Sequence, residues 1–209
     1  MNITERKLVQ INVDVQNDFC PGGALAVPKG DEVIQPLNTL AHVVREKGGI
    51  VIATQDFHPE QTSHFEQWPV HCVAGTEGAE FHPGLEVKDV DVVVQKGTEV
   101  DEDAYSGFDG KDRAARALKE IVLPDGEIKQ VNILIGGLAT DYCVKATVLD
   151  ALELAKDNDA VTVYALVDAM RAVNIKETDG KEALVDMGVA GARLITTENA
   201  INRINRGEL

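Results

Sequence analysis

Four apolar segments of the sequence are each followed by side chains that can do chemistry. The first segment ends at Asp14, the second at Asp56 with His58 two residues later, and the third at Lys96, and Cys143 comes shortly after the fourth. In open parallel sheets, ligands bind beyond the carboxyl ends of the strands. If the segments are such strands, a carboxylate, a carboxylate–imidazole pair, an amine and a thiol meet at one edge. This combination indicates catalysis by a cysteine nucleophile.

Cys143 is the candidate nucleophile. It falls in the first turn of a predicted helix if Thr140 or Asp141 is the N-cap. The free amides and positive dipole of that turn favour the reactive thiolate and offer N–H groups to an oxyanion. Local sequence alone equally allows a cysteine that only packs beneath the helix. The presence of Asp14 and Lys96 at the same edge favours the nucleophile.

Asp14 and Lys96 are candidates to assist this thiol. Asp14 stands among apolar residues, where a carboxylate must pair or shift its pKa. It can act as the base that takes the thiol proton and returns it to a leaving group. The alternative is a turn or capping aspartate, a role that suits Asp18 better. Lys96 can hold Asp14 ionised and stabilise negative charge, or it can be a solvated lysine at a strand end.

Residues 57–90 form a long segment without a predicted helix or strand, and they contain four of the five histidines. A loop of this length inside a compact domain is usually functional, and the alternative is a surface excursion. Carboxylate and imidazole ligands suit zinc, iron or manganese. The candidates for such a site are Asp56, His58, His64 and His71. His82 is a further ligand or a solvated loop residue, and His42, within a predicted helix, is interpreted as structural.

Aromatic residues make up only 4% of the chain, so their positions are informative. Phe19, Trp68 and Tyr105 all follow the candidate catalytic segments. Flat side chains near a nucleophile suit a flat substrate with apolar faces. The alternative is ordinary packing in the core and loops.

The elements that must position these residues alternate between two types. Short apolar, β-branched runs predict strands at 8–15, 50–54, 90–95, 131–135, 161–167 and 193–196. Helical spacing of apolar residues predicts helices at 31–47, 111–121, 141–156 and 178–187. Gly48, Gly49 and Gly188 stand where these helices are expected to end. The alternation predicts an α/β fold with helices on both faces of a parallel sheet.

The bulk composition limits the classes of function. The 209 residues show no repeat and no linker, which predicts a single domain over 1–209 with a metal-site loop at about 57–90. A formal net charge of −15 argues against nucleic acid and membrane partners. The three cysteines are too few for a disulfide framework, and the start of the chain has no signal-peptide pattern. We therefore expect a cytoplasmic protein.

Five segments of the sequence, in order, resemble the nicotinamidase/pyrazinamidase branch of the isochorismatase-like cysteine hydrolases. They are 14–23, 56–58, 68–72, 96–98 together with 105–108, and 136–144. The segments around Asp14, Lys96 and Cys143 resemble the whole superfamily. The histidine set and the stretch 105–108 are more specific to nicotinamidases.

The resemblance implies a three-layer α/β/α fold with a six-stranded parallel sheet in the order 3-2-1-4-5-6. It implies a triad in which Cys143 is the nucleophile, Asp14 the base and Lys96 the electrostatic support. It also implies a cis peptide between Leu138 and Ala139, and an oxyanion hole formed by the N–H groups of Ala139 and Cys143.

The resemblance further implies one divalent transition metal ion, with zinc favoured over iron or manganese. Asp56, His58 and His71 are the implied ligands, and His64, at a position that varies among relatives, is expected to be the fourth. The metal or its water would hold a pyridine nitrogen, with Phe19 and Trp68 beside the ring. Relatives often have Trp where this chain has Phe57, which we expect to pack rather than to bind metal.

The implied reaction is hydrolysis of nicotinamide, and of pyrazinamide, through a cysteine thioester, in NAD salvage. One alternative is a superfamily hydrolase acting on ureidoacrylate, N-carbamoylsarcosine or isochorismate, which is not expected to carry the histidine set. Another is a non-catalytic protein that binds pyridines or senses metal. The expected partner is a small-molecule substrate, and the sequence leaves open an assembly of identical subunits.

Overall fold

The computed structural model describes residues 7–123, 130–156 and 158–209. The first six residues, where we expect no leader, lie outside the described residues. A six-stranded, all-parallel sheet in the order β3-β2-β1-β4-β5-β6 confirms the predicted fold and strand order. The strands are β1 (Lys7–Val13), β2 (Ile50–Asp56), β3 (Val92–Lys96), β4 (Val131–Leu138), β5 (Val161–Arg171) and β6 (Arg193–Ile195).

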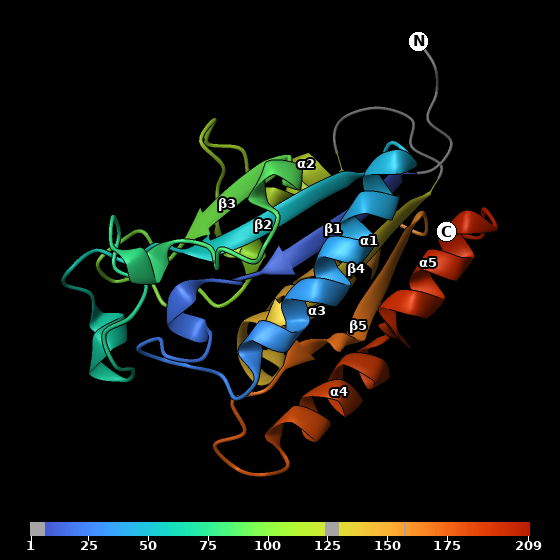
Figure 1. Ribbon diagram of the computed structural model, residues 1–209. Helices are drawn as coiled ribbons and strands as arrows, with labels where there is room; N and C mark the ends of the chain where they lie inside the picture. The colour runs from blue at the N-terminus through green and yellow to red at the C-terminus, as the bar shows by residue number, and fades with distance from the viewer. Residues whose placement is uncertain (1–6, 124–129, 157) are drawn as a thin grey trace.

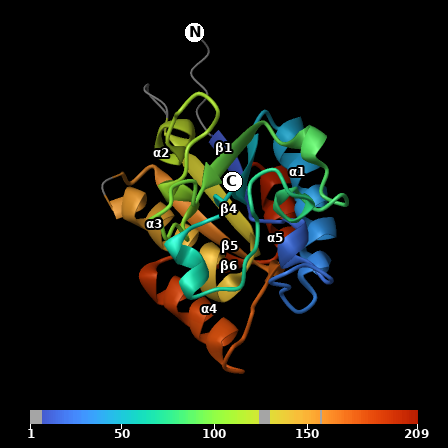
Figure 2. The same cartoon turned by 90° about the vertical axis from the view of Figure 1, so that its left-hand side faces the viewer.

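Helices cover both faces of this sheet, which explains why its central strands β1 and β4 are buried along nearly their whole length. Seen end-on, α1 and α5 lie on one side of the sheet and α2 and α3 on the other (Figure 2). Each side has its own apolar core: Leu37 and Ala200 belong to one, and Leu118 and Val148 to the other. The α-helices are α1 (Ile34–Glu46), α2 (Leu118–Val122), α3 (Lys145–Lys156), α4 (Asp179–Ala190) and α5 (Thr197–Asn205).

The carboxyl ends of β1, β2 and β3 point toward the same loop-rich end of the molecule (Figure 1). Residues 57–90, all of them described, have only short 3-10 helices and isolated bridges there, in agreement with the predicted loop. The short helices of the chain are η1 (Asn17–Phe19), η2 (Gly30–Val33), η3 (Ser63–Glu66), η4 (Glu77–Ala79), η5 (Val87–Asp89), η6 (Gly107–Asp109) and the π-helical turn η7 (Thr140–Val144).

The helix predicted at 111–121 is wrong for most of its length, because only Leu118–Val122 is helical. The Asp112 carboxylate accepts hydrogen bonds from the Ala114 and Arg116 amides, both at 2.9 Å, and folds the segment into a turn. Ala115 in that turn has a φ of 58°. Local bonds from an aspartate have therefore overridden a helical pattern of apolar residues.

Of the helix ends predicted at glycines, the end of α1 is confirmed and the end of α4 is wrong. Gly48, with a φ of 75°, follows the end of α1 as expected. Gly188 lies inside α4, however, and Gly191, with a φ of 115°, ends that helix instead. We did not predict α5, whose N-cap Thr196 accepts a hydrogen bond from the Asn199 amide. Among the described helices, none has the length and apolar character needed to cross a membrane.

Candidate active site

Three of the predicted site residues lie where their strands end. Asp56 and Lys96 are the last residues of β2 and β3, and they are paired in the register of these strands. Asp14 directly follows β1, where its φ of 49° turns the chain out of the sheet two residues earlier than predicted. Cys143 lies in η7, just after β4. All four side chains are buried.

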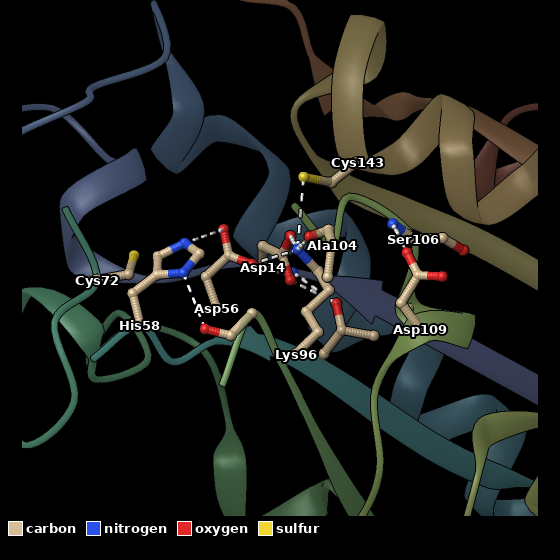
Figure 3. Close-up of polar contacts among 12 residues, drawn as sticks. Asp14, Asp56, His58, Cys72, Lys96, Ala104, Ser106, Asp109 and Cys143 are labelled. Carbon is tan, nitrogen blue, oxygen red and sulfur yellow. Dashed lines mark hydrogen bonds and ion pairs between the residues drawn. The ribbon is translucent and has the colours of Figure 1, made fainter. Parts of the chain in front are cut away.

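The Lys96 ammonium is at the centre of this cluster (Figure 3). Its Nζ lies 3.0 Å from Asp14 Oδ2 and 3.6 Å from Cys143 Sγ, contacts Asp56 Oδ1, and donates to the Ala104 carbonyl at 3.1 Å. Burial alone would lower the pKa of Lys96, but the carboxylates of Asp14 and Asp56 hold it well above its usual value. The lysine is 1% exposed, which rules out a solvated strand-end residue.

Asp14 is held by a residue that we did not predict. Thr54, on β2, donates its hydroxyl to Asp14 Oδ1 at 2.6 Å and accepts the Asp14 amide at 3.2 Å. This leaves Oδ2 facing Lys96. Burial raises the pKa of Asp14 although Lys96 opposes the shift. Thr54 carries no sequence signal, because it reads as an ordinary β-branched strand residue.

The Cys143 thiol lies close to both carboxylates. One carboxylate oxygen each of Asp14 and Asp56, and Cys143 Sγ, are within 4.8 Å of one another. Burial raises the pKa of the Cys143 thiol well above its usual value, Lys96 opposes this, and the nearby carboxylates add to it. Before substrate binds, the proton therefore stays on sulfur, next to a carboxylate that can take it.

The turn that carries Cys143 differs from the predicted helix start. Its N-cap is Ala139, not Thr140 or Asp141, and the Ala139 carbonyl accepts the amides of Tyr142 and Val144 at 3.1 and 3.0 Å. The Asp141 carboxylate instead accepts two amides of the chain after β5, at 2.9 and 2.8 Å. It therefore fixes a different loop. The peptide between Leu138 and Ala139 is cis, as the resemblance implies.

Three loop histidines gather beside Asp56. His58 and Val73 form a parallel bridge, which brings His71 back toward His58. One ring nitrogen each of His58, His64 and His71 lies within 4.8 Å of the others, and the three rings are buried. On the other side of each ring, Nδ1 lies 3.0 Å from the Gly97 carbonyl for His58, 2.7 Å from the Pro69 carbonyl for His71 and 2.6 Å from Asp103 Oδ1 for His64. Because these oxygens only accept, Nδ1 carries the proton and Nε2 offers its lone pair.

Asp56 joins the histidines to the catalytic cluster. Its Oδ2 lies 3.7 Å from His58 Nε2, while Oδ1 contacts Lys96 (Figure 3). The same Oδ2 lies 4.0 Å from His71 Nε2. Burial alone would raise the pKa of Asp56, but the Lys96 ammonium holds it below its usual value. The carboxylate is therefore ionised, with one oxygen on the Lys96 ammonium and the other toward the histidines.

A cleft with an empty volume of about 450 Å³ opens onto both clusters. The three predicted aromatic residues line it, and Trp68 Nε1 donates to the Tyr105 hydroxyl at 2.9 Å. We did not predict Tyr142, whose ring meets that of Trp68 edge-on with centroids 5.0 Å apart, although its place beside Cys143 was a usable signal. The lining residues are Phe19, Leu25, Val27, Asp56, His64, Trp68, His71, Ala104, Tyr105, Ala139, Tyr142, Cys143 and Val173.

Comparisons with known proteins agree with this geometry. The family model of the isochorismatase domain matches residues 9–199. The chain belongs to the isochorismatase family. Nicotinamidase of Escherichia coli is 40% identical over 203 residues, which cover 88% of this chain and 92% of that protein.

Two solved structures of this family are also similar. The pyrazinamidase of Pyrococcus horikoshii in complex with zinc has a TM-score of 0.75 and 40% identity, covering 91% of this chain and 99% of that one. The PnC1 protein of L. infantum in complex with nicotinate has a TM-score of 0.78 and 28% identity, covering 95% and 97% of the two chains.

The residues of this family member fit a divalent metal ion. Asp56 and the three histidines offer three nitrogens and one oxygen, a donor set that suits such an ion. His58 Nε2 is buried and has no hydrogen-bond partner among the described residues, which a coordinate bond would remedy. Phe57 packs against the core, as expected.

The remaining histidines and Asp18 lie outside this donor set. His82 Nδ1 accepts the Gly84 amide at 3.1 Å, and His42 on α1 lies 3.1 Å from Glu86. Asp18 accepts the amides of Ala24 and Cys72 at 3.1 and 2.7 Å, the loop-organising role suggested by its position.

Proposed function

We propose that the protein hydrolyses nicotinamide to nicotinic acid and ammonia through a thioester on Cys143. The observation that carries this proposal is that Cys143, which lies beside Lys96 and Asp14, lines the same aromatic cleft as His64 and His71 of the histidine set. The aromatic lining of the cleft suits a flat pyridine ring, and similarity to a nicotinamidase over most of the chain supports the choice of substrate.

Acylation would begin when Asp14 takes the Cys143 proton and the sulfur attacks the carboxamide carbon. The N–H groups of Ala139 and Cys143 are our candidates to stabilise the oxyanion. As the carbon–nitrogen bond breaks, Asp14 returns the proton to the departing ammonia. A water molecule, deprotonated by Asp14, then attacks the thioester, and nicotinic acid leaves as the proton returns to sulfur.

Lys96 would keep its charge throughout this cycle, because the carboxylates that surround it outweigh burial. Its ammonium, 3.6 Å from the sulfur, stabilises the thiolate as it forms. Phe19, Trp68 and Tyr105 would bind the faces and edge of the ring.

Asp56, His58, His64 and His71 would hold the metal ion, and we propose zinc because the donor set suits it and the pyrazinamidase relative was solved with zinc. When bound, the ion supplies a Lewis acid that anchors the ring nitrogen. Pyrazinamide has a ring nitrogen at the same place, so it should also be hydrolysed. The product suits recycling of nicotinamide toward NAD, in a cytoplasm where the free thiols Cys20, Cys72 and Cys143 would stay reduced.

The test is ammonia release from nicotinamide, with ureidoacrylate and N-carbamoylsarcosine offered at equal concentration. We expect strong preference for nicotinamide, loss of turnover in Cys143→Ala with nicotinamide still bound, and full turnover in the matched control Cys20→Ala. Turnover retained by Cys143→Ala would remove this thiol from the mechanism. Preference for ureidoacrylate or N-carbamoylsarcosine would assign a different superfamily reaction. Binding without ammonia release would indicate a non-catalytic pyridine-binding protein.

A further inference from the structure

Asp103 lies in the loop between β3 and η6 and belongs to an acidic stretch with Glu99, Asp101 and Glu102. Its Oδ1 is 2.6 Å from His64 Nδ1. The His64 side chain is only 5% exposed, whereas that of Asp103 is 44% exposed. An exposed carboxylate thus reaches inward to a buried imidazole.

The partner of His64 differs in kind from those of the other two histidines. His58 and His71 are oriented by main-chain carbonyls, which the fold of the loop fixes. The ring of His64 is held at Nδ1 by a side chain that bears a charge. Its own segment is the four-residue η3, where the Thr62 hydroxyl accepts the His64 amide at 3.2 Å. The orientation of the ring therefore depends on Asp103 more than on the backbone.

The pair of Asp103 and His64 lies beside the aromatic wall of the cleft. The Tyr105 hydroxyl accepts the Trp68 indole N–H at 2.9 Å, and burial raises the pKa of Tyr105, to which the nearby Asp103 carboxylate adds. The Tyr105 ring packs against that of His64 with centroids 5.9 Å apart. The His64 ring that Asp103 contacts therefore also packs against a wall of the cleft, so its orientation bears on the shape of the cleft.

We propose that Asp103 is a positioning residue that fixes His64 as the fourth protein ligand of the metal site. This inference rests on the proposed function, because it takes the histidine set to be a metal site. Groups that accept the second N–H of a metal-binding histidine fix its ring and make the other nitrogen a better donor. The competing interpretation is a surface ion pair that contributes little beyond local stability.

The test measures zinc affinity by competition with a chromogenic chelator, which needs no turnover. We expect Asp103→Ala to lower the affinity about tenfold to a hundredfold, the usual effect of removing such a partner. Asp103→Asn should fall in between, because it keeps an acceptor without the charge. Asp101→Ala is the matched control, since it removes an equal exposed charge two residues away and should leave the affinity within about twofold.

A double-mutant cycle with His64→Ala separates positioning from a general effect of charge. If Asp103 acts through His64, Asp103→Ala should cost nothing further in the His64→Ala background. Equal losses in both backgrounds would overturn the proposal, as would wild-type affinity in Asp103→Ala. Wild-type protein that binds no zinc, iron or manganese would overturn the metal site itself, whereas a metal-binding protein that does not cleave nicotinamide would overturn only the proposed reaction.

Discussion

Replacing Thr54 by Val should slow catalysis without weakening substrate binding. The Thr54 hydroxyl donates to Asp14 Oδ1 at 2.6 Å and accepts the Asp14 amide at 3.2 Å, both inside the buried core. Valine has nearly the same shape, so it keeps the methyl group that packs near Gly107. The substitution therefore removes two hydrogen bonds and leaves the packing unchanged.

The expected size of the effect follows from the charge on Asp14. A hydrogen bond to a charged group contributes about 1.5–3 kcal/mol. If the Asp14 carboxylate needs this bond to keep Oδ2 toward Lys96 and the thiol, that energy is lost from the transition state. At about 1.4 kcal/mol for each factor of ten, kcat should fall roughly 10- to 150-fold. KM should stay within about twofold, because Thr54 does not line the cleft.

The assay is steady-state ammonia release from nicotinamide, with a thermal melt of each variant to confirm folding. Thr54→Ser keeps the hydroxyl and should keep most of kcat, although it loses the methyl contact. Thr39→Val, an exposed threonine on α1, is a matched control that should behave as wild type. A wild-type kcat in Thr54→Val, or a Thr54→Ser variant as slow as Thr54→Val, would refute the argument that the hydroxyl orients Asp14.

Two further predictions concern the metal site and Cys20. In Gly97→Ala, the new Cβ would lie 2.5 Å from His58 Cε1, at a φ of +65° that alanine rarely adopts. We expect the zinc affinity, measured by chelator competition, to fall at least tenfold because the His58 ring is displaced. An unchanged affinity would show that the loop around Gly97 moves instead of the ring. Burial, with the nearby Asp31 carboxylate, raises the pKa of Cys20 to about 11. Only about one molecule in a thousand then carries the Cys20 thiolate at pH 8, so alkylation of Cys20 should be about 100- to 250-fold slower than that of a free cysteine. The rate, followed by mass spectrometry, should rise about tenfold per pH unit up to that pKa, and rapid labelling of the folded protein at pH 8 would contradict the prediction.

The strands and the residues at their ends could be predicted together, because the same apolar pattern that indicates a buried strand also shows where the strand stops. A parallel strand buried on two faces must be an apolar, β-branched run, and a charged residue that interrupts it marks its end. Asp56 and Lys96 are such residues, and both lie where the sequence places them. Asp14 followed the same logic, although its positive φ ends β1 earlier than the apolar pattern suggests.

Contacts between distant side chains left no such signal. Thr54 binds Asp14 across 40 residues, and Asp103 binds His64 across 39. In the sequence, Thr54 is a typical strand residue, and Asp103 belongs to a run of charged residues of a kind that usually faces solvent. The N-cap predicted at Thr140 or Asp141 is wrong for a related reason. In the sequence, an aspartate that caps its own helix cannot be distinguished from one whose carboxylate accepts amides of a distant loop, as Asp141 does.

Asp56 contacts both the residues around Cys143 and the histidine set. One of its oxygens contacts the Lys96 ammonium, and the other faces the Nε2 atoms of His58 and His71. The register that pairs Asp56 with Lys96 thereby sets the distance between the nucleophile cluster and the histidine set. The carboxamide of the proposed substrate must reach Cys143 while its ring nitrogen faces the histidines. The distance between these two groups of the substrate must therefore match the distance between the two groups of the site. The selectivity that we propose for a pyridine carboxamide is therefore built into the pairing of two neighbouring strands, and the loops only complete it.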